Sequence, residues 1–315
     1  MSPRAAVRIL IVGAGAIGGY FGARLIDAGR DVTFLVRPRR AEQLRRDGLA
    51  VLSPLGNLNL PVPPLVSAHD LKEHYGLVIV SSKSYDLEAS IRDFAPAVGP
   101  SSMVLPLLNG MRHLDVLDAR FGEQRVLGGL ARISSTLDAE GRIHQLGAFN
   151  ALAFGPRSPG AEAAVAEISE CLRVPGFEAI LSANILHEMW EKWVFIAAAA
   201  STTSLMRAAV GDIMAADAAD IPVRLLQECG AIAAQNGFPP REAATNAGLA
   251  VLTTPGSSFT ASMLRDIEQG SRIEADHIVG DLLRRASTSP PAALLSTAYA
   301  HLRSYEARRK RESEK

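Results

Sequence analysis

A glycine-rich segment near the start of the chain has the spacing of a phosphate-binding turn. The pattern G-x-G-x-x-G is matched by Gly13, Ala14, Gly15, Ala16, Ile17 and Gly18. In such a turn the first glycine permits a tight bend, the second lets the backbone approach a pyrophosphate, and the third lets the helix pack on the strand. The amides at the helix start and the helix dipole then favour phosphate. We predict dinucleotide binding here; a flexible turn is the alternative.

The residue at position 37 bears on which dinucleotide binds. NAD-binding units place an acidic residue about 20 positions after the glycines, where its carboxylate accepts from the ribose hydroxyls. Arg37 stands at that place and is followed by Pro38, Arg39 and Arg40. A guanidinium can bind a ribose 2′-phosphate through two hydrogen bonds, whereas a carboxylate would repel it. The sequence therefore favours NADP over NAD, with an ordinary solvated basic loop as the alternative.

Two further polar residues come directly after expected strands. Lys83 follows residues 77–82, and Asn109 follows residues 102–108. Ligands of open parallel sheets bind beyond the carboxyl ends of the strands, so both residues are candidates to contact the cofactor or the substrate. The alternatives are a surface lysine and a common Asn-Gly turn.

Lys192 is the candidate for proton transfer in the second half of the chain. It lies beside Trp190 and Trp193, at the start of the apolar helical run 194–206. Partial burial would lower the pKa of a lysine from about 10.4 and make it a usable proton donor. On the residues alone, an exposed i, i+4 pair with Glu188 is the favoured alternative.

Ser262 and Glu274 lie in a pattern that predicts two helices. The first spans residues 258–267 and ends near Gly270, and the second starts at Ser271. Glu274 comes three residues after Ser271, which is the spacing of a capping box and gives Glu274 a structural role. In one straight helix Ser262 and Glu274 would lie about 18 Å apart, too far to share a small substrate. A break at Gly270 removes that objection.

The elements that must position these side chains change in type along the chain. Apolar runs predict strands at residues 7–12, 31–36, 77–82, 102–108, 126–133 and 143–154, with helices at 17–28, 84–94, 116–121 and 161–172. From Asn184 onward helical patterns dominate, with breaks at residues 237–240, 254–256 and 289–291. This order predicts an α/β fold: an N-terminal Rossmann-type NADP-binding domain over residues 1–182, then an all-helical substrate and catalytic domain over residues 183–315.

Composition narrows the class of protein. A length of 315 residues predicts about two domains, and zero net charge argues against a protein built to bind nucleic acid or an anionic membrane. The start of the chain is too short and polar for a signal peptide, and residues 194–206 fall short of the roughly 20 residues needed to span a bilayer. Cys171 and Cys229 lack metal-ligand spacing, which favours a reduced, cytoplasmic protein. The seven histidines suggest no metal site.

Taken together, these residues resemble the ketopantoate reductase family over almost the whole chain. The resemblance rests on the glycine turn, Arg37, Lys83, Asn109-Gly110, Glu191-Lys192-Trp193, residues 262–266 and Glu274, and it continues to Leu302. It implies reduction of 2-dehydropantoate to (R)-pantoate with NADPH, a step toward pantothenate and coenzyme A. It also implies that the helical domain closes over the cleft.

The resemblance further implies a role for each matched residue. Lys192 would be the general acid, and Glu274 would help to hold the lysine and the substrate hydroxyl. Asn109 would lie between the nicotinamide and the substrate, and Ser262 would bind the substrate. A 2-oxo acid is thus the expected small-molecule partner, and a homodimer is the assembly we consider.

Three positions depart from the family pattern. Ile196, Ala200 and Phe259 stand where members of the best-known type often carry polar side chains. Three hypotheses follow: a ketopantoate reductase, a reductase of similar build that acts on a more apolar 2-oxo acid, and an NADP-binding sensor without turnover. Retention of both Lys192 and Glu274 argues against the sensor, which would need neither.

Overall fold

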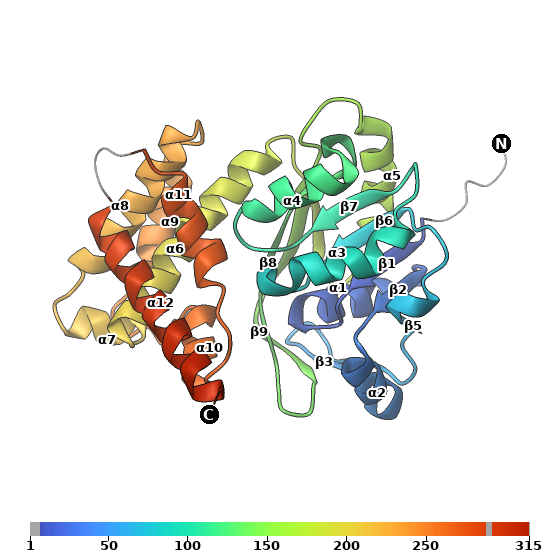
Figure 1. Ribbon diagram of the computed structural model, residues 1–315, viewed down its shortest axis with the longest axis horizontal. Coiled ribbons are helices and arrows are strands. Elements are labelled where there is room, and N and C mark those ends of the chain that lie inside the picture. The colour runs from blue at the N-terminus through green and yellow to red at the C-terminus, as the bar shows by residue number, and fades with distance from the viewer. Residues whose placement is uncertain (1–6, 288–291, 315) are drawn as a thin grey trace. The chain divides into compact units, whose positions relative to one another are not determined.

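The computed structural model describes residues 7–287 and 292–314, and the chain forms two compact units (Figure 1). Unit 1 comprises Met1–Leu108 and His113–Leu186, and unit 2 comprises Asn109–Arg112 and His187–Lys315. The segment Asn109–Arg112 is therefore grouped with the second half of the chain, although it follows a strand of the first. The start of the chain before Val7 and the expected break at residues 289–291 lie outside the described residues.

A five-stranded parallel sheet forms the centre of unit 1 (Figure 1). Its strand order is β5-β2-β1-β6-β7, and the strands are β1 (Ile9–Val12), β2 (Val32–Leu35), β5 (Leu65–Val66), β6 (Leu77–Val80) and β7 (Met103–Pro106). Every residue of β1, β6 and β7 is buried, as expected for apolar strands covered on both faces. The chain crosses from one side of β1 to the other between β5 and β6, which creates a switch point at β1. The predicted Rossmann-type fold is confirmed.

Helices and a second sheet complete unit 1. The helices are α1 (Ala16–Asp27), α2 (Pro38–Asp47), α3 (Leu87–Phe94), α4 (Arg112–Phe121) and α5 (Glu162–Leu172), with 3₁₀ turns η1 (Ala68–Asp70), η2 (Ser84–Asp86), η3 (Ala95–Ala97) and η4 (Glu123–Arg125). The second sheet runs β10-β9-β3-β4, and β8 pairs antiparallel with β9. Its strands are β3 (Leu49–Leu52), β4 (Leu58–Leu60), β8 (Gly128–Leu137), β9 (Ile143–Gly155) and β10 (Glu178–Leu181).

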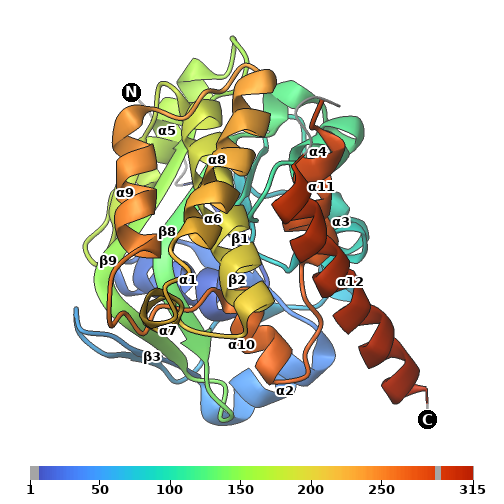
Figure 2. The same cartoon turned by 90° about the vertical axis from the view of Figure 1, so that its left-hand side faces the viewer.

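The regular elements of unit 2 are helices in the part that the structure describes. Its helices are α6 (Ile185–Met206), α7 (Val210–Ala215), α8 (Asp220–Gln235), α9 (Glu242–Leu252), α10 (Ser262–Glu268), the π-helix η5 (Asp276–Gly280), α11 (Asp281–Arg284) and α12 (Ala293–Ser313). Helix α8 packs against α9 and α12 (Figure 2). The expected breaks after α8 and after α9 are confirmed. Over residues 7–287 and 292–314, no helix combines the length and apolar character that crossing a membrane requires.

Candidate active site

The glycine turn after β1 has the geometry that a pyrophosphate needs. Gly13 has φ +95°, a left-handed conformation that side-chain-bearing residues rarely adopt. A Cβ on Gly18 would collide with Ser81 Oγ and the Gly13 carbonyl oxygen, so only glycine fits there. A Cβ on Gly15, by contrast, would meet no atom within 4 Å. Because Gly15 directly precedes α1, this open space lies where the first helical amides can donate hydrogen bonds to a phosphate.

Two side chains that the sequence interpretation missed brace this turn. Ser81 Oγ lies 3.0 Å from the Val12 carbonyl oxygen and 3.1 Å from that of Gly13, so its hydroxyl ties the end of β6 to the end of β1. Arg40 Nε donates to the Ala14 carbonyl oxygen at 3.1 Å, and its other nitrogens donate to Gly141 and Gln43. Burial lowers the pKa of this guanidinium. Arg40 therefore supports the turn from α2, a role that its place in a basic run did not reveal.

Arg37 and the segment that begins with Lys83 come together beyond the sheet. Arg37 directly precedes α2, and its side chain is 58% exposed. Its Nη2 lies 3.1 Å from Asp86 Oδ1, the carboxylate of the last residue of η2. Lys83 is exposed and directly precedes η2. The two cofactor candidates thus flank the end of β1 from β2 and from β6.

Asn109 is held by the π-helix of unit 2. A hydrogen bond links the His277 ring to the Asn109 backbone. Gly110 has φ +80°, and a Cβ on it would lie 3.1 Å from His277 Cδ2, so the ring packs directly on this turn. Arg112 Nη1 lies 3.2 Å from Asp276 Oδ2 and adds an ion pair to the same contact. The structure therefore brings Asn109 onto the element that follows Glu274.

Asp276 is the centre of a polar cluster that fixes this π-helix. Its carboxylate accepts from the Tyr299 hydroxyl at 2.6 Å and from Arg284 Nη1 at 3.0 Å, besides the pair with Arg112. Burial alone would raise the pKa of Asp276, but these hydrogen bonds hold it below its ordinary value. His277 is 8% exposed, and burial lowers its pKa. π-Helical turns are frequent at functional sites.

Lys192 lies in α6 among anchored neighbours. Its side chain is half-buried, and Trp190 and Trp193 on either side are buried. Glu191 accepts from the backbone amide of Arg241 at 2.9 Å and from Arg241 Nε at 2.8 Å, which connects α6 to the start of α9. Trp193 Nε1 donates to the Ile278 carbonyl oxygen at 2.8 Å. The helix that carries Lys192 is thus fixed to α9 and to the π-helix.

The region from Ser262 to Glu274 differs partly from the prediction. Ser262 is the exposed first residue of α10, so the helix starts four residues later than expected. The break at Gly270 is confirmed: its φ is +67°, and the Ser271 amide donates to the Asp266 carbonyl oxygen at 2.8 Å, as in a Schellman C-cap.

The predicted capping box of Ser271 and Glu274 is wrong. Helix α12 holds residues 271–274 outside any helix, because the Tyr305 hydroxyl donates to the Ser271 carbonyl oxygen at 2.7 Å. Glu306 also accepts from the Ile273 amide at 2.8 Å. Glu274 instead stands directly before the next helical turn, and its carbonyl oxygen accepts from the Ile278 amide. Its carboxylate therefore does not serve as the expected cap.

The three departures from the family pattern lie in or near α6. Ile196 is half-buried one helical turn after Lys192, and Ala200 is buried one turn further. Phe259 precedes α10, and its ring centroid lies 6.2 Å from that of Phe195. The substitutions thus give apolar surroundings to the helix face that follows Lys192.

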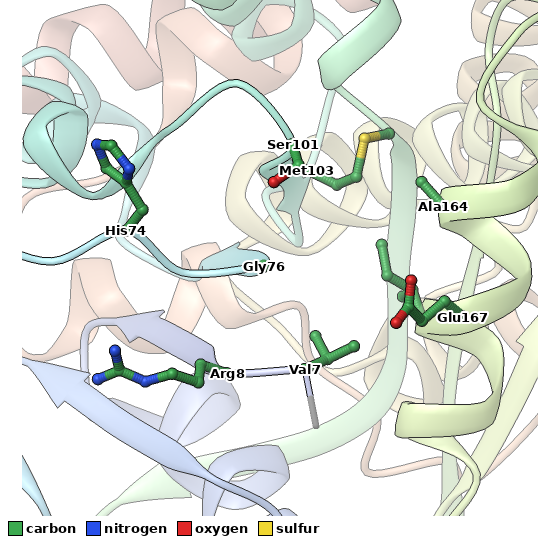
Figure 3. Close-up of a pocket in the computed structure, with 9 residues that line it drawn as sticks. Val7, Arg8, His74, Gly76, Ser101, Met103, Ala164 and Glu167 are labelled. Carbon is green, nitrogen blue, oxygen red and sulfur yellow. The ribbon is translucent and has the colours of Figure 1, made fainter. Parts of the chain in front are cut away.

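A separate cavity of about 270 Å³ opens at the amino ends of the strands of the parallel sheet (Figure 3). Its lining includes Arg8, Gly76 and Met103, which stand at the amino ends of β1, β6 and β7. The glycine turn follows the carboxyl end of β1, so this cavity is not the predicted cofactor site. In Figure 3 the Arg8 and His74 side chains point away from Glu167. Across the described part of the chain, no group of three His, Cys, Asp or Glu side chains is arranged to hold a metal ion.

Comparison with known proteins gives consistent matches along the chain. The family profile described as ketopantoate reductase PanE/ApbA matches residues 9–159, and the profile of its C-terminal part matches residues 184–306. An uncharacterised oxidoreductase of Bacillus subtilis, YkpB, is 38% identical over 96% of this chain and 99% of its own. A 2-dehydropantoate 2-reductase of Pyrococcus horikoshii is 28% identical over 89% of this chain and 91% of its own.

Solved structures share the fold. The 2-dehydropantoate 2-reductase of Geobacter metallireducens matches with a TM-score of 0.85 and 27% identity, over 95% of this chain and 99% of its own. D-mandelate dehydrogenase in complex with NADH and anilino(oxo)acetate matches with a TM-score of 0.86 and 20% identity, over 96% and 99%. A dimeric ketopantoate reductase from Staphylococcus aureus matches with a TM-score of 0.80 and 18% identity, over 96% and 100%.

Proposed function

Because the chain belongs to the ketopantoate reductase (PanE/ApbA) family, we propose that it reduces 2-dehydropantoate to (R)-pantoate with NADPH. It is an NAD(P)-dependent oxidoreductase of ketopantoate reductase type. The substrate and the preference for NADPH are the proposed parts. One observation carries the reductase proposal: Asn109 belongs to the same compact unit as Lys192, Ser262 and Glu274, although it directly follows the predicted end of a sheet strand. The preference for NADPH rests on Arg37.

The cofactor part of the proposal rests on unit 1. The turn from Gly13 to Gly18 would bind the pyrophosphate, with Ala14, Ala16 and Ile17 contributing backbone. The open space at Gly15 and the collision that any Cβ on Gly18 would cause support that fit. Arg37 would bind the ribose 2′-phosphate, and Lys83 and Asn109 would contact the remainder of the cofactor. The reduced nicotinamide, when bound, supplies a hydride to the carbonyl carbon of the substrate.

The catalytic part of the proposal rests on unit 2. As the carbon gains hydride, the electron pair of the C=O bond moves to oxygen and leaves an alkoxide. The Lys192 ammonium stabilises this alkoxide and gives it a proton, which Lys192 later regains from solvent. Glu274 orients the lysine and the new hydroxyl. Asn109 orients the ketone, and Ser262 binds the other end of the substrate.

A second candidate substrate is a more apolar 2-oxo acid. Ile196, Ala200 and Phe259 provide no side-chain hydrogen bond for the terminal hydroxyl of 2-dehydropantoate. The resemblance to the family implies polar side chains at these positions. A buried hydroxyl without a partner costs about 1–3 kcal/mol. A substrate without that hydroxyl avoids this cost.

The test compares two substrates that differ in one hydroxyl. Purified protein is supplied with NADPH and with either 2-dehydropantoate or 3,3-dimethyl-2-oxobutanoate, which has a methyl group in place of the hydroxymethyl group. A higher kcat/KM for 2-dehydropantoate supports the first proposal, and a higher value for the methyl compound supports the second. If the protein binds NADPH but oxidises it with none of these or other 2-oxo acids, both substrate proposals are contradicted. The NADP-binding sensor is then the remaining hypothesis.

Assembly and location complete the proposal. We expect a homodimer in the reducing cytoplasm, with a 2-oxo acid as the small-molecule substrate. Cys229 is buried and burial raises its pKa, and the pKa of half-buried Cys171 is raised by burial as well, so both thiols are poorly suited to oxidation. Sedimentation of the purified protein measures the oligomeric state.

A further inference from the structure

An ion pair spans the end of the central strand in unit 1. Strands β2 and β6 lie on either side of β1. Arg37 follows β2 and Asp86 follows β6, yet Arg37 Nη2 and Asp86 Oδ1 are only 3.1 Å apart. The side chains must therefore meet beyond the carboxyl end of β1, where the glycine turn begins. This is the side on which a dinucleotide would lie.

Hydrogen bonds hold the backbone on both sides of this ion pair, so side-chain rotation is the simplest way for the pair to open. The Arg37 carbonyl oxygen accepts from the Ala41 amide at 3.0 Å, and the rigid Pro38 follows. The Asp86 amide donates to the Lys83 carbonyl oxygen at 2.9 Å. Asp86 also directly precedes α3, where aspartate commonly caps a helix, but its side chain makes no cap hydrogen bond. The carboxylate is directed to Arg37 instead.

We propose that Asp86 competes with the ribose 2′-phosphate for Arg37 and so limits the preference of this protein for NADPH. The inference rests on the proposed use of Arg37 as the phosphate ligand. A dianionic phosphate next to the Asp86 carboxylate would be repelled, so the guanidinium must exchange one anion for the other. NADH carries no 2′-phosphate and requires no such exchange. The ion pair therefore opposes NADPH selectively.

The neighbouring charged residues provide control variants for Arg37 and Asp86. Arg40 already donates to Ala14, Gly141 and Gln43, so moving it to a phosphate would release the glycine turn. Arg39 is exposed, two residues from Arg37. Arg39→Ala is therefore the matched control for Arg37→Ala. Glu88 is exposed two residues after Asp86, and Glu88→Gln reproduces the charge change of Asp86→Asn.

The test is binding of adenosine 2′,5′-bisphosphate and of 5′-AMP, measured by calorimetry, with NADPH and NADH as the full-length counterparts. Because the bisphosphate has no nicotinamide, the readout is independent of turnover. Asp86→Asn should raise the affinity for the bisphosphate by about three- to tenfold and leave the affinity for 5′-AMP within about twofold of the wild-type value. Glu88→Gln should change neither. In an Arg37→Ala background, Asp86→Asn should have no effect on the bisphosphate.

Two results would overturn the proposed role of Asp86 and leave the NADPH preference intact. In the first, Asp86→Asn lowers the affinity for the bisphosphate, which would make the carboxylate a support that orients Arg37. In the second, Asp86→Asn changes the affinities for both ligands equally, while Arg37→Ala still lowers the affinity for the bisphosphate selectively. A third result would overturn both the NADPH preference and this inference. In that case the wild type binds both ligands with equal affinity, and Arg37→Ala changes neither affinity.

Discussion

The indole Nε1 of Trp193 donates to the carbonyl oxygen of Ile278 across 2.8 Å, in a region where both residues are buried. Trp193 directly follows Lys192, and Ile278 lies one turn after Glu274. One hydrogen bond therefore connects the helix of the proposed acid with the element of the proposed carboxylate. This connection fixes the relative position of the two segments without using either of the side chains proposed to act in catalysis.

Trp193→Phe should weaken both the fold and the reaction. The change keeps an aromatic ring but leaves the buried Ile278 carbonyl oxygen without its donor, which costs about 1–3 kcal/mol of unfolding free energy. Urea denaturation measures that loss, and kcat should fall while the Kd of NADPH is unchanged. Trp190→Phe makes the same indole-to-phenyl change at a neighbouring residue, which stacks on Phe238, and is the control. Equal effects of the two variants on kcat would contradict a positioning role for Trp193.

Lys192→Ala should lower kcat by about 100-fold or more, the usual range for loss of a positioned general acid. NADPH binding, measured by fluorescence titration, should survive because the proposed cofactor turn is in unit 1. Turnover close to that of the wild type in a folded variant would return Lys192 to the salt-bridge alternative with Glu188.

Glu274→Gln should also impair turnover. The variant keeps the size of the side chain and removes its charge. Because Tyr305 and Glu306, and not a capping box, hold residues 271–274, the folded state should retain its melting temperature within a few degrees. A large loss of thermal stability together with normal kcat would show that the carboxylate is structural.

Ile196→Asn should improve the use of 2-dehydropantoate if nothing else supplies the missing polar contact. Ile196 lies one helical turn after Lys192, so both project from the same face of α6. One neutral hydrogen bond is worth up to about 1.5 kcal/mol in kcat/KM. The ratio of kcat/KM for 2-dehydropantoate over 3,3-dimethyl-2-oxobutanoate is the measurement. A high ratio in the wild type that the variant does not raise would remove the main support for the apolar substrate.

The stability of unit 2 should fall as the pH drops below about 6.5. Burial lowers the pKa of His277, which lies beside Glu274, Asp281 and Arg112. Below the pKa of this histidine in the unfolded chain, the unfolded state therefore binds more protons than the folded state. The lowered pKa of Asp276 acts in the same direction at more acidic pH. Urea midpoints from about pH 8 to about pH 5 measure the effect. His277→Gln should flatten this dependence; an unchanged dependence would exclude His277 as its source.

Local patterns in the sequence predicted the elements that depend on local forces. The apolar run before Gly13 and the glycine spacing are enough to specify β1, the turn and α1. Strands β4 and β5 have three and two residues, too few for a periodic signal. Strands β3, β5 and β10 pair with strands that lie far away in the sequence. The capping box failed for a similar reason: Ser271 is held by Tyr305, a contact over 34 residues.

The candidate site shows the same division. Lys192 and Glu274 could be selected by residue type and by resemblance, because each lies in a recognisable segment. The contact between Arg112 and Asp276 joins residues 164 positions apart, so no local sequence spacing predicts it. The ion pair of Arg37 with Asp86 is equally hidden, because its partners follow two different strands. Tertiary structure, and not local preference, determines which charged residues meet.

Transfer of deuterium from NADPH labelled at C4 of the nicotinamide shows directly whether the protein reduces a 2-oxo acid. The protein is incubated with the labelled cofactor and either 2-dehydropantoate or 3,3-dimethyl-2-oxobutanoate, and the product is analysed by mass spectrometry. We expect the wild type to form a 2-hydroxy acid with one deuterium on the carbon that bears the new hydroxyl, and Lys192→Ala to lose this product. Tight binding of NADPH with no labelled 2-hydroxy acid from either substrate, or from a wider set of 2-oxo acids, would contradict this expectation.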